Sequence, residues 1–479
     1  MTIQTLIADL DLAINSGSSR HATFQVYDPA TRNAIAEVPN ARALDATAAV
    51  SAAAAAFPEW SAAAPRQRSE ILRRCFELLV QQSDELTALI CAENGKPQSD
   101  ARAEVTYAAE FFRWYAEEAV RTDGSYGTAP AGAAHTVVTH KPVGVAALVT
   151  PWNFPAAMAT RKIAPALAAG CTVVLKPAAE TPLTAIAIAR LLAKAGVPDG
   201  VVNLVPTTDA AGIVSTWLAD SRVRKISFTG SSAVGRRLLA QAAGRVVNAS
   251  MELGGNAPFV VTSDADIRAA VQGAMIAKFR GGGQACTAAN RFYVHAAVSD
   301  EFVARFGAAI QSLRVGPASD PASQVGPMIT AKAADDVRAL VAGSVAEGAV
   351  ISHQAPAPAD SWYVAPTLLT HVPPNARILT EEIFGPVAPV VAWDNEGDLL
   401  HQLNDTEYGL AAYVYAGRLQ DALRIAAATE AGMVGINRGL ISDPSAPFGG
   451  VKQSGLGREG ARDGLREFQE TQYFSIDSM

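Results

Sequence analysis

One cysteine of the chain stands where covalent chemistry is possible. Cys286 follows three consecutive glycines in the segment KFRGGGQACTAANRF, residues 278–292, and its neighbours give no apolar reason for a thiol. A nucleophilic cysteine reacts as a thiolate, and glycine-rich backbone lets a substrate come close while amide groups stabilise the developing charge. Cys75, Cys91 and Cys171 lie in helical or apolar patterns that are typical of packing. The residues alone leave a packing role open for Cys286 as well.

Two further segments carry groups that complement a reactive thiol. In NASMELGGNAPF, Glu252 follows a short apolar strand and precedes two glycines, where a carboxylate can be partly desolvated as a general base. In TPWNFP, two prolines fix a turn that presents Trp152 and Asn153, and an asparagine amide can donate to an oxyanion. A lone strand-end glutamate is usually structural, and a proline-braced turn can exist for its shape alone. Both segments nevertheless favour a catalytic role for Cys286.

Two strand ends are candidates for binding phosphate. The segment VRKISFTGSSAVGRRLL ends a strand at Thr229 and begins a helix with Gly230 and Ser231, whose amides could receive a pyrophosphate. The segment VVLKPAAETP places Lys176 at the carboxyl end of another strand, where open sheets bind ligands. The GxGxxG fingerprint does not occur at a strand-to-helix junction. The alternatives to phosphate binding are that Gly230 only shapes a turn and that Lys176 is a solvated residue at a strand end.

The elements that must position these groups are predicted to be of the α/β class. Apolar residues recur at helical spacing over residues 43–57 and 66–94, and a Gly, Ala and Pro-rich linker over 122–142 leads into an alternating strand. From residue 143, short apolar runs alternate with helical stretches, which is the pattern of a parallel sheet. A second α/β region runs from about 254 to 450. The sequence therefore predicts two α/β domains.

The tail EFQETQYFSID, residues 467–477, alternates polar and apolar side chains as an exposed strand would. A lone terminal strand usually pairs with another chain. We expect a homo-oligomer, either a dimer or a tetramer.

The composition of the chain limits the classes of partner that it is expected to bind. The formal net charge of −7 argues against nucleic acid or an anionic membrane. The four cysteines show no CxxC spacing, so neither a disulfide framework nor a metal site is expected, and a reducing cytoplasm fits. Residues 1–17 do not read as an export signal, and Pro151 and Pro155 interrupt the longest apolar region before it reaches the length of a membrane helix. A small molecule is the expected partner.

The motifs TPWNFP, ELGGNAPF, GGGQAC, EEIFGP and PFGGVKQSGLGRE, in this order, resemble those of the aldehyde dehydrogenase superfamily. The segments FPAAMATRKIAPALAAGCTVVLKPA, SMELGGNAPFVV and NDTEYGLAAYVYA are most similar to succinate-semialdehyde dehydrogenases. The resemblance implies an aldehyde dehydrogenase fold with an atypical Rossmann cofactor domain, an α/β catalytic domain and a small oligomerisation strand region. The expected bounds are 1–121 and 143–253 for the cofactor-binding domain, 254–455 for the catalytic domain, and 122–142 with 456–479 for the oligomerisation region.

The resemblance also implies a mechanism. Cys286 would attack the aldehyde to give a thiohemiacetal, whose oxyanion Asn153 and the Cys286 amide would hold. Hydride transfer to nicotinamide would leave a thioester, and Glu252 would activate the water that releases the carboxylic acid. The implied cofactor-binding residues are Trp152, Lys176, Ala179, Gly230, Ser231, Glu382 and Phe384.

Three positions match those that bind the far carboxylate in succinate-semialdehyde dehydrogenases, namely Arg161, Arg280 and Ser442. Guanidinium groups suit that task because they bind a carboxylate with two hydrogen bonds. The resemblance thus implies oxidation of succinate semialdehyde or a close ω-carboxy aldehyde such as glutarate semialdehyde. The alternative is that each arginine pairs with a structural acid, in an aldehyde dehydrogenase of broader specificity.

Two departures from the family pattern bear on the cofactor and on redox control. Many relatives have a second cysteine two residues after the nucleophile, whereas this chain has Ala288, so no disulfide switch is expected. NAD-preferring relatives often have a glutamate at the position of Ala179, and here Glu180 is displaced by one. The lost acid leaves room for a 2′-phosphate beside Lys176, which favours NADP, although Glu180 keeps NAD possible.

The sequence disfavours two other functions, a non-catalytic binding role and acyl transfer to coenzyme A. A non-catalytic protein that keeps the fold for binding would have lost Cys286, Glu252 or Asn153, and all three are present. An enzyme that transfers the acyl group to coenzyme A would use a thiol in place of water, and the retained Glu252 disfavours it.

Overall fold

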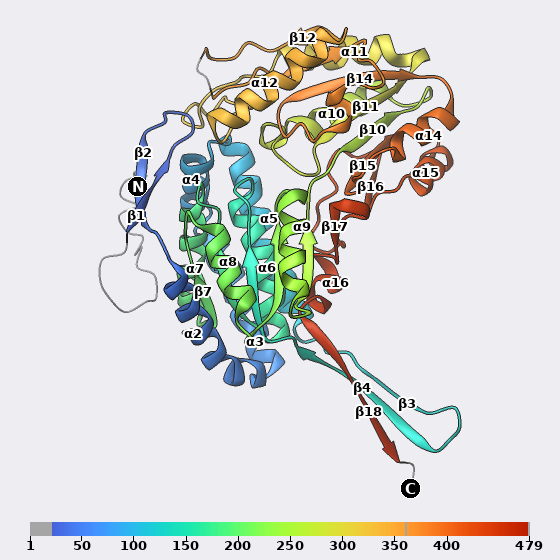
Figure 1. Cartoon of the computed structure of the whole chain (residues 1–479). Coiled ribbons are helices and arrows are strands. Elements are labelled where there is room, and N and C mark those ends of the chain that lie inside the picture. The colour runs from blue at the N-terminus through green and yellow to red at the C-terminus, as the bar shows by residue number, and fades with distance from the viewer. Residues whose placement is uncertain (1–21, 360–361, 478–479) are drawn as a thin grey trace.

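Two largely parallel sheets and a projecting arm make up the computed structural model, which describes residues 22–359 and 362–477 (Figure 1). The α/β class predicted from the sequence is confirmed by these sheets and the helices that cover them. The expectation about an export signal concerns residues that lie outside the described ones. The domain bounds stay a prediction.

The first sheet has the strand order β17-β9-β8-β5-β6-β7, and all pairs are parallel except β17 with β9. Every residue of its central strands β5 and β6 is buried, as in parallel sheets covered by helices on both faces. The strands are β5 (Val145–Val149), β6 (Thr172–Lys176), β7 (Val202–Leu204), β8 (Val223–Thr229), β9 (Asn248–Glu252) and β17 (Gly455–Leu456).

Helices cover both faces of this sheet. One core joins the sheet to α3, α4, α5, α6 and α7, and α6 is buried along its whole length. A second core on the other face joins it to α2, α8 and α9. The helices are α2 (Ala43–Ala62), α3 (Pro65–Gln81), α4 (Ser83–Asn94), α5 (Gln98–Glu118), α6 (Pro155–Ala169), α7 (Pro182–Ala195), α8 (Ala210–Ala219), α9 (Ser232–Ala243) and α16 (Ala461–Arg466).

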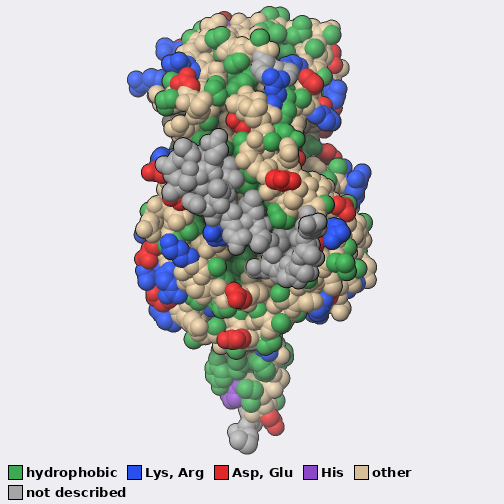
Figure 2. Space-filling view, turned by 90° about the vertical axis from the view of Figure 1, so that its left-hand side faces the viewer, with side chains coloured by type: hydrophobic (Ala, Val, Ile, Leu, Met, Phe, Trp, Pro, Cys, Tyr) green, Lys and Arg blue, Asp and Glu red, His purple; other side chains and the backbone are tan. Residues whose placement is uncertain are grey.

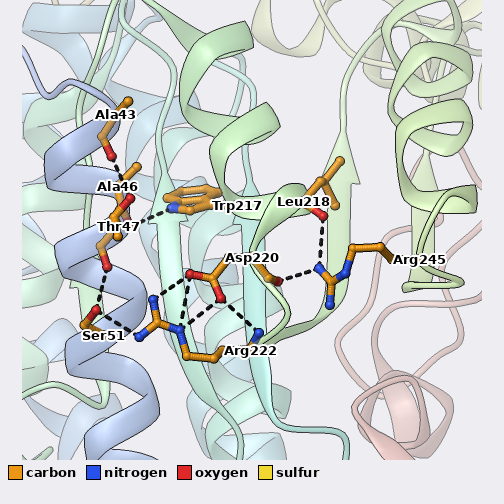
Figure 3. Close-up of polar contacts among 9 residues, drawn as sticks. All are labelled: Ala43, Ala46, Thr47, Ser51, Trp217, Leu218, Asp220, Arg222 and Arg245. Carbon is orange, nitrogen blue, oxygen red and sulfur yellow. Dashed lines mark hydrogen bonds and ion pairs between the residues drawn. The ribbon is translucent and has the colours of Figure 1, made fainter.

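Polar contacts fix the helices of the second face to one another (Figure 3). The indole of Trp217 donates to the Ala46 carbonyl at 3.2 Å, which joins α8 to α2. Arg222 pairs with Asp220 and also donates to Ser51 Oγ at 3.0 Å. The first bond thus joins two helices, and Arg222 joins the turn between α8 and β8 to α2.

The second sheet has the order β12-β13-β14-β11-β10-β15-β16, and only β12 runs antiparallel to its neighbour. Its strands are β10 (Ala257–Val261), β11 (Ala289–His295), β12 (Val350–Gln354), β13 (Thr367–Thr370), β14 (Val387–Trp393), β15 (Ala411–Tyr415) and β16 (Met433–Ile436). Its helices are α10 (Ile267–Phe279), α11 (Ala296–Gln311), α12 (Ala331–Ala346), α13 (Arg377–Thr380), α14 (Glu396–Asn404) and α15 (Leu419–Ala428), with short 3₁₀ turns η1 (Arg280–Gly283) and η2 (Lys452–Ser454).

The arm is a three-stranded antiparallel sheet that leaves the body at its lower end (Figure 1). It consists of β3 (Ser125–Thr128), β4 (Ala134–Pro142) and β18 (Gln469–Asp477), and β18 pairs with β4 along its full length. The predicted terminal strand is therefore present, with a partner in its own chain. Tyr473 remains 58% exposed. The preceding helix α16 packs on α5 and α6, so only the strands project. A separate hairpin pairs β1 (Thr23–Tyr27) with β2 (Ala34–Pro39).

Charged side chains of both signs are interspersed over the face drawn in Figure 2. Within residues 22–359 and 362–477, no helix combines the length and the apolar character needed to cross a bilayer.

Candidate active site

A cavity opens at the carboxyl ends of three neighbouring strands of the first sheet. The segments that follow β5, β8 and β9 line one wall, and the opposite wall comes from the loops before β11 and β14. Open α/β sheets bind ligands at this edge. The cavity has a volume of about 950 Å³, its open mouth included. Ten predicted site residues line it: Trp152, Asn153, Arg161, Gly230, Ser231, Arg280, Cys286, Glu382, Phe384 and Ser442.

Three predicted residues do not line this cavity. Glu252 is buried at the end of β9, directly before two residues that do line it. Lys176 ends β6, beside β5 in the sheet, and Ala179 follows it in the next loop. Lys176 and Ala179, which are predicted to bind the cofactor, therefore lie at the next strand end along the same edge.

The nucleophile loop adopts a conformation that only glycines accept readily. Gly281, Gly282 and Gly283 all have positive φ angles, of 61°, 65° and 74°. A Cβ on Gly255 would lie 2.2 Å from the carbonyl oxygen of Cys286, so this second glycine lets the loop approach the end of β9. These glycines explain how the half-buried thiol reaches the cavity.

Burial raises the pKa of the Cys286 thiol to about 12. The positive charges of Arg161 and Arg280 act in the opposite direction, and the carboxylates of Glu382 and Glu252 act with burial. Without a substrate, the thiol is therefore protonated at neutral pH. Cys75 and Cys171 belong to the core on the α3 to α7 face, which agrees with a packing role.

Asn153 follows β5 and points its side chain toward the nucleophile loop. Its Nδ2 donates to the Gln284 carbonyl at 3.0 Å, and its Oδ1 is buried without a hydrogen-bond partner. The Gln284 side chain in turn accepts a bond of 3.1 Å from the Ile329 amide. The amide of Asn153 is thus fixed two residues from Cys286, where it can donate to an oxyanion.

Glu252 is a buried carboxyl whose charge is disfavoured. Its side chain is 3% exposed, and one of its oxygens has no hydrogen-bond partner. Burial raises its pKa well above the usual range, and the nearby negative charge of Glu459 adds to the effect, while Arg161 and Lys162 oppose it. A carboxyl in this setting holds a proton readily, as a general base must once it has accepted one.

Arg161 already has a carboxylate partner. It is 1% exposed and forms an ion pair with Glu459, which also pairs with Lys162. Its guanidinium carbon lies 4.1 Å from the centroid of the Phe448 ring. Arg161 therefore lines the cavity and also belongs to a buried charge cluster, so its role in substrate binding stays a prediction. The sequence reasoning missed Glu459 and Lys162, although Glu459 ends the motif PFGGVKQSGLGRE.

Arg280 differs because no carboxylate of the described residues forms an ion pair with it. Its guanidinium carbon lies 5.0 Å from the centroid of the Phe154 ring, and the side chain is half-buried in the cavity wall. Ser442 lines the same cavity. The backbone at this point is anchored by Asp100, which accepts a bond of 2.7 Å from the Gly281 amide. Arg280 is thus an available cation on the cavity wall.

The predicted cofactor-binding residues that line the cavity form a wall with both apolar and polar groups. Trp152 and Phe384 contact each other edge to face, with ring centroids 5.6 Å apart. Glu382 accepts a bond of 3.1 Å from the Gly255 amide, and burial raises its pKa to about 7. Ser231 is the N-cap of α9. The Gly230 amide is already bonded to the Glu252 carbonyl at 3.0 Å, and the Val234 and Gly235 amides are bonded to Ser231, so a phosphate here would face the amides of Ser232 and Ala233.

Burial lowers the pKa of Lys176 to about 8, while Glu180 raises it. The Thr229 hydroxyl lines the cavity, is buried and has no hydrogen-bond partner. An unpartnered buried hydroxyl beside a helix N-terminus fits a polar cofactor group. Over residues 22–359 and 362–477, no group of three or more His, Cys, Asp and Glu side chains could hold a metal ion.

Comparison with known proteins agrees with this geometry. A succinate-semialdehyde dehydrogenase from Paenarthrobacter nicotinovorans is 53% identical over 92% of this chain and 98% of its own length. A glutarate-semialdehyde dehydrogenase from Pseudomonas aeruginosa is 45% identical over 95% of this chain and 94% of its own. The crystal structure of an E. coli NADP-dependent enzyme is 42% identical, covers 97% of this chain and all of its own (100%), and superposes with a TM-score of 0.94. The sequence model of the aldehyde dehydrogenase family matches residues 15–474. The predicted aldehyde dehydrogenase fold is thus confirmed, and the chain belongs to that family.

Proposed function

We propose that this protein oxidises succinate semialdehyde, or a close ω-carboxy aldehyde, to the dicarboxylic acid with NADP. The observation that carries the substrate class is Arg280, a cation on the wall of the cavity that contains Cys286. A guanidinium without a carboxylate partner suits a substrate that brings its own carboxylate. Two relatives named for succinate and glutarate semialdehyde support this choice.

The residues of the site would divide the chemistry among them. The Cys286 thiol would pass its proton to solvent water, and Sγ would form a bond to the aldehyde carbon while the carbonyl electrons move to oxygen. Asn153 Nδ2 donates to that oxygen. The carbon of this thiohemiacetal would then lose a hydride, for which NADP supplies the acceptor when bound, and the oxygen would re-form the C=O bond of a thioester on Cys286. Glu252 then removes a proton from water, the water oxygen attacks the resulting thioester, and the Cys286 thiolate leaves as the acid is released.

Several groups would hold the cofactor. The first turn of α9 would bind the pyrophosphate, and Thr229 offers an unpartnered hydroxyl beside it. Glu382 would bind the nicotinamide ribose. Lys176 would meet the adenosine ribose, and the absence of an acid at Ala179 favours a 2′-phosphate there. The similarity to the E. coli enzyme described as NADP-dependent supports this preference.

The test of this function is a set of initial rates. Purified protein is assayed with succinate semialdehyde, glutarate semialdehyde and butanal, each with NADP and with NAD. We expect the highest kcat/KM for one of the two carboxylate substrates with NADP. Equal kcat/KM for butanal would contradict the carboxylate site and would favour the broader aldehyde dehydrogenase. Adding coenzyme A should not raise the rate, because Glu252 is retained to activate water.

We also propose a homo-oligomer, a dimer or tetramer, that forms through the arm in the cytoplasm. Tyr473, Phe474 and Ile476 are exposed on β18, an edge strand that can pair with another chain. The Tyr473→Asp variant places a charge on this strand and should lower the mass measured by light scattering after size exclusion. An unchanged oligomeric mass would argue against the arm as the interface.

A further inference from the structure

A buried ion pair lies behind the turn that carries Asn153. Lys96 Nζ is 2.6 Å from Glu104 Oε2, and the two side chains are 3% and 0% exposed. Lys96 follows α4, and Glu104 lies in α5. Neither residue is part of the cavity wall, and nothing in the proposed mechanism uses them.

The Lys96 ammonium has three partners around it. Besides Glu104, it donates to the main-chain carbonyl of Asn153 at 2.6 Å. It also lies 4.0 Å from the centroid of the Phe154 ring, within the range of a cation–π contact. Two of the three N–H donors of the ammonium are thus directed at Glu104 and Asn153, and its charge also faces the ring of the next residue, Phe154.

Glu104 uses its other oxygen on the same part of the chain. Its Oε1 accepts bonds from the Ala156 amide at 2.8 Å and the Ala157 amide at 3.3 Å, in the first turn of α6. These amides have no partner within the helix, and a carboxylate there is favoured by the helix dipole. The Asn94 side chain adds a bond of 3.0 Å to the Trp152 carbonyl. The turn is thus held before, at and after Asn153.

The ion pair of Lys96 and Glu104 contributes more to the position of the turn than to the stability of the fold. A buried ion pair gains little over an apolar pair of the same shape, because both charges lose their hydration. An oxyanion donor, by contrast, must be placed closely, since a displacement of about 1 Å can lower a rate by about 100-fold. Among the described residues, the Asn153 side-chain nitrogen donates to the Gln284 carbonyl alone, so the backbone of the turn decides where that amide points.

We infer that Lys96 and Glu104 are positioning residues, which hold the Asn153 amide where the oxyanion of the substrate forms. This inference rests on the proposed function, because it assumes that Asn153 stabilises an oxyanion. The ion pair acts through the backbone of the turn and does not touch the substrate.

A matched control exists in the same region. Glu93 is also fully buried, and its carboxylate caps α7 through the Leu183 and Thr184 amides at 2.7 and 2.9 Å. Glu93→Gln and Glu104→Gln are the same substitution at two helix N-termini, but only Glu104 pairs with the ammonium that donates to the Asn153 carbonyl. Both should lower the melting temperature, and Glu104→Gln should lower it more, because it also leaves the buried Lys96 ammonium without its carboxylate.

The experiment measures kcat and KM for succinate semialdehyde in Glu104→Gln, Glu93→Gln, Asn153→Ala and the double variant of Glu104→Gln with Asn153→Ala. We expect Glu104→Gln to lower kcat by about 10- to 100-fold, with little change in KM, because it misplaces an oxyanion donor. Glu93→Gln should keep kcat within about 3-fold of the unmodified enzyme, in line with ordinary additivity errors. In the Asn153→Ala background, Glu104→Gln should cost less than about 3-fold more.

Each other outcome has a distinct meaning. An equal loss from Glu104→Gln with and without Asn153, or an equal loss from Glu93→Gln, would overturn the inference and leave the proposed function standing. Full activity of Asn153→Ala would overturn the oxyanion role itself and the inference with it. If Glu104→Gln does not fold, Lys96→Met measured in the same two backgrounds gives the same test.

Discussion

Replacing Arg280 with alanine tests the proposed carboxylate site most directly. The change removes the cation of the cavity wall that has no carboxylate partner among the described residues, and it leaves the ion pair of Arg161 with Glu459 intact. A hydrogen bond to a charged group contributes about 1.5–3 kcal/mol, and a guanidinium makes two to a carboxylate. Because Arg280 is half-buried, solvent screening weakens these hydrogen bonds. We therefore expect the variant to lose about 3 kcal/mol of binding free energy in the transition state.

A loss of about 3 kcal/mol corresponds to a fall of roughly 150-fold in kcat/KM for succinate semialdehyde. Butanal lacks the carboxylate, so its kcat/KM should change by less than about 3-fold. Arg280→Lys keeps the charge but not the paired donors, and should fall between the two. The assay follows reduced cofactor at 340 nm for both aldehydes, with a thermal melt of each variant. An equal fall for both aldehydes would refute the reasoning and make Arg280 structural.

Further predictions concern the charge cluster, the base, the thiol and the cofactor. Arg161→Ala should lower the melting temperature and the rates with both aldehydes, because breaking a buried ion pair costs about 3–5 kcal/mol; a selective loss with the carboxylate substrate would assign Arg161 to substrate binding. Glu252→Gln should release one equivalent of reduced cofactor per site in a rapid burst and then turn over slowly, since the thioester forms but is not hydrolysed; stopped-flow absorbance measures this. With the pKa of Cys286 raised to about 12, its alkylation by iodoacetamide in the absence of cofactor should rise about tenfold per pH unit from pH 7 to 10, and a plateau below pH 9 would contradict that pKa. Ala179→Glu should lower the ratio of kcat/KM with NADP to that with NAD by at least about tenfold, because a carboxylate repels a 2′-phosphate; an unchanged ratio would place the phosphate elsewhere.

Local patterns predicted the fold class and most of the cavity wall. The glycine run before Cys286 indicated an unusual backbone, and all three glycines have positive φ angles. The apolar runs indicated parallel strands, and the alternating tail became β18. The helical pattern over residues 66–94 did not reveal a break, and the structure divides this stretch into α3 and α4 at Gln82. These features could be predicted because they depend on neighbours a few residues away.

Sequence alone determined which groups this protein has for chemistry, and the tertiary structure decided how each is held and charged. The sequence offers Arg161 and Arg280 as equivalent cations, yet Glu459 reaches only the first, from the far end of the chain. Lys96 donates to the Asn153 carbonyl although the two residues are 57 positions apart in the sequence, and no local pattern predicts this contact. The pKa of Cys286 likewise follows from burial and from charges on separate elements. Such properties arise only when distant segments pack together, because burial and electrostatic energy depend on distance in space.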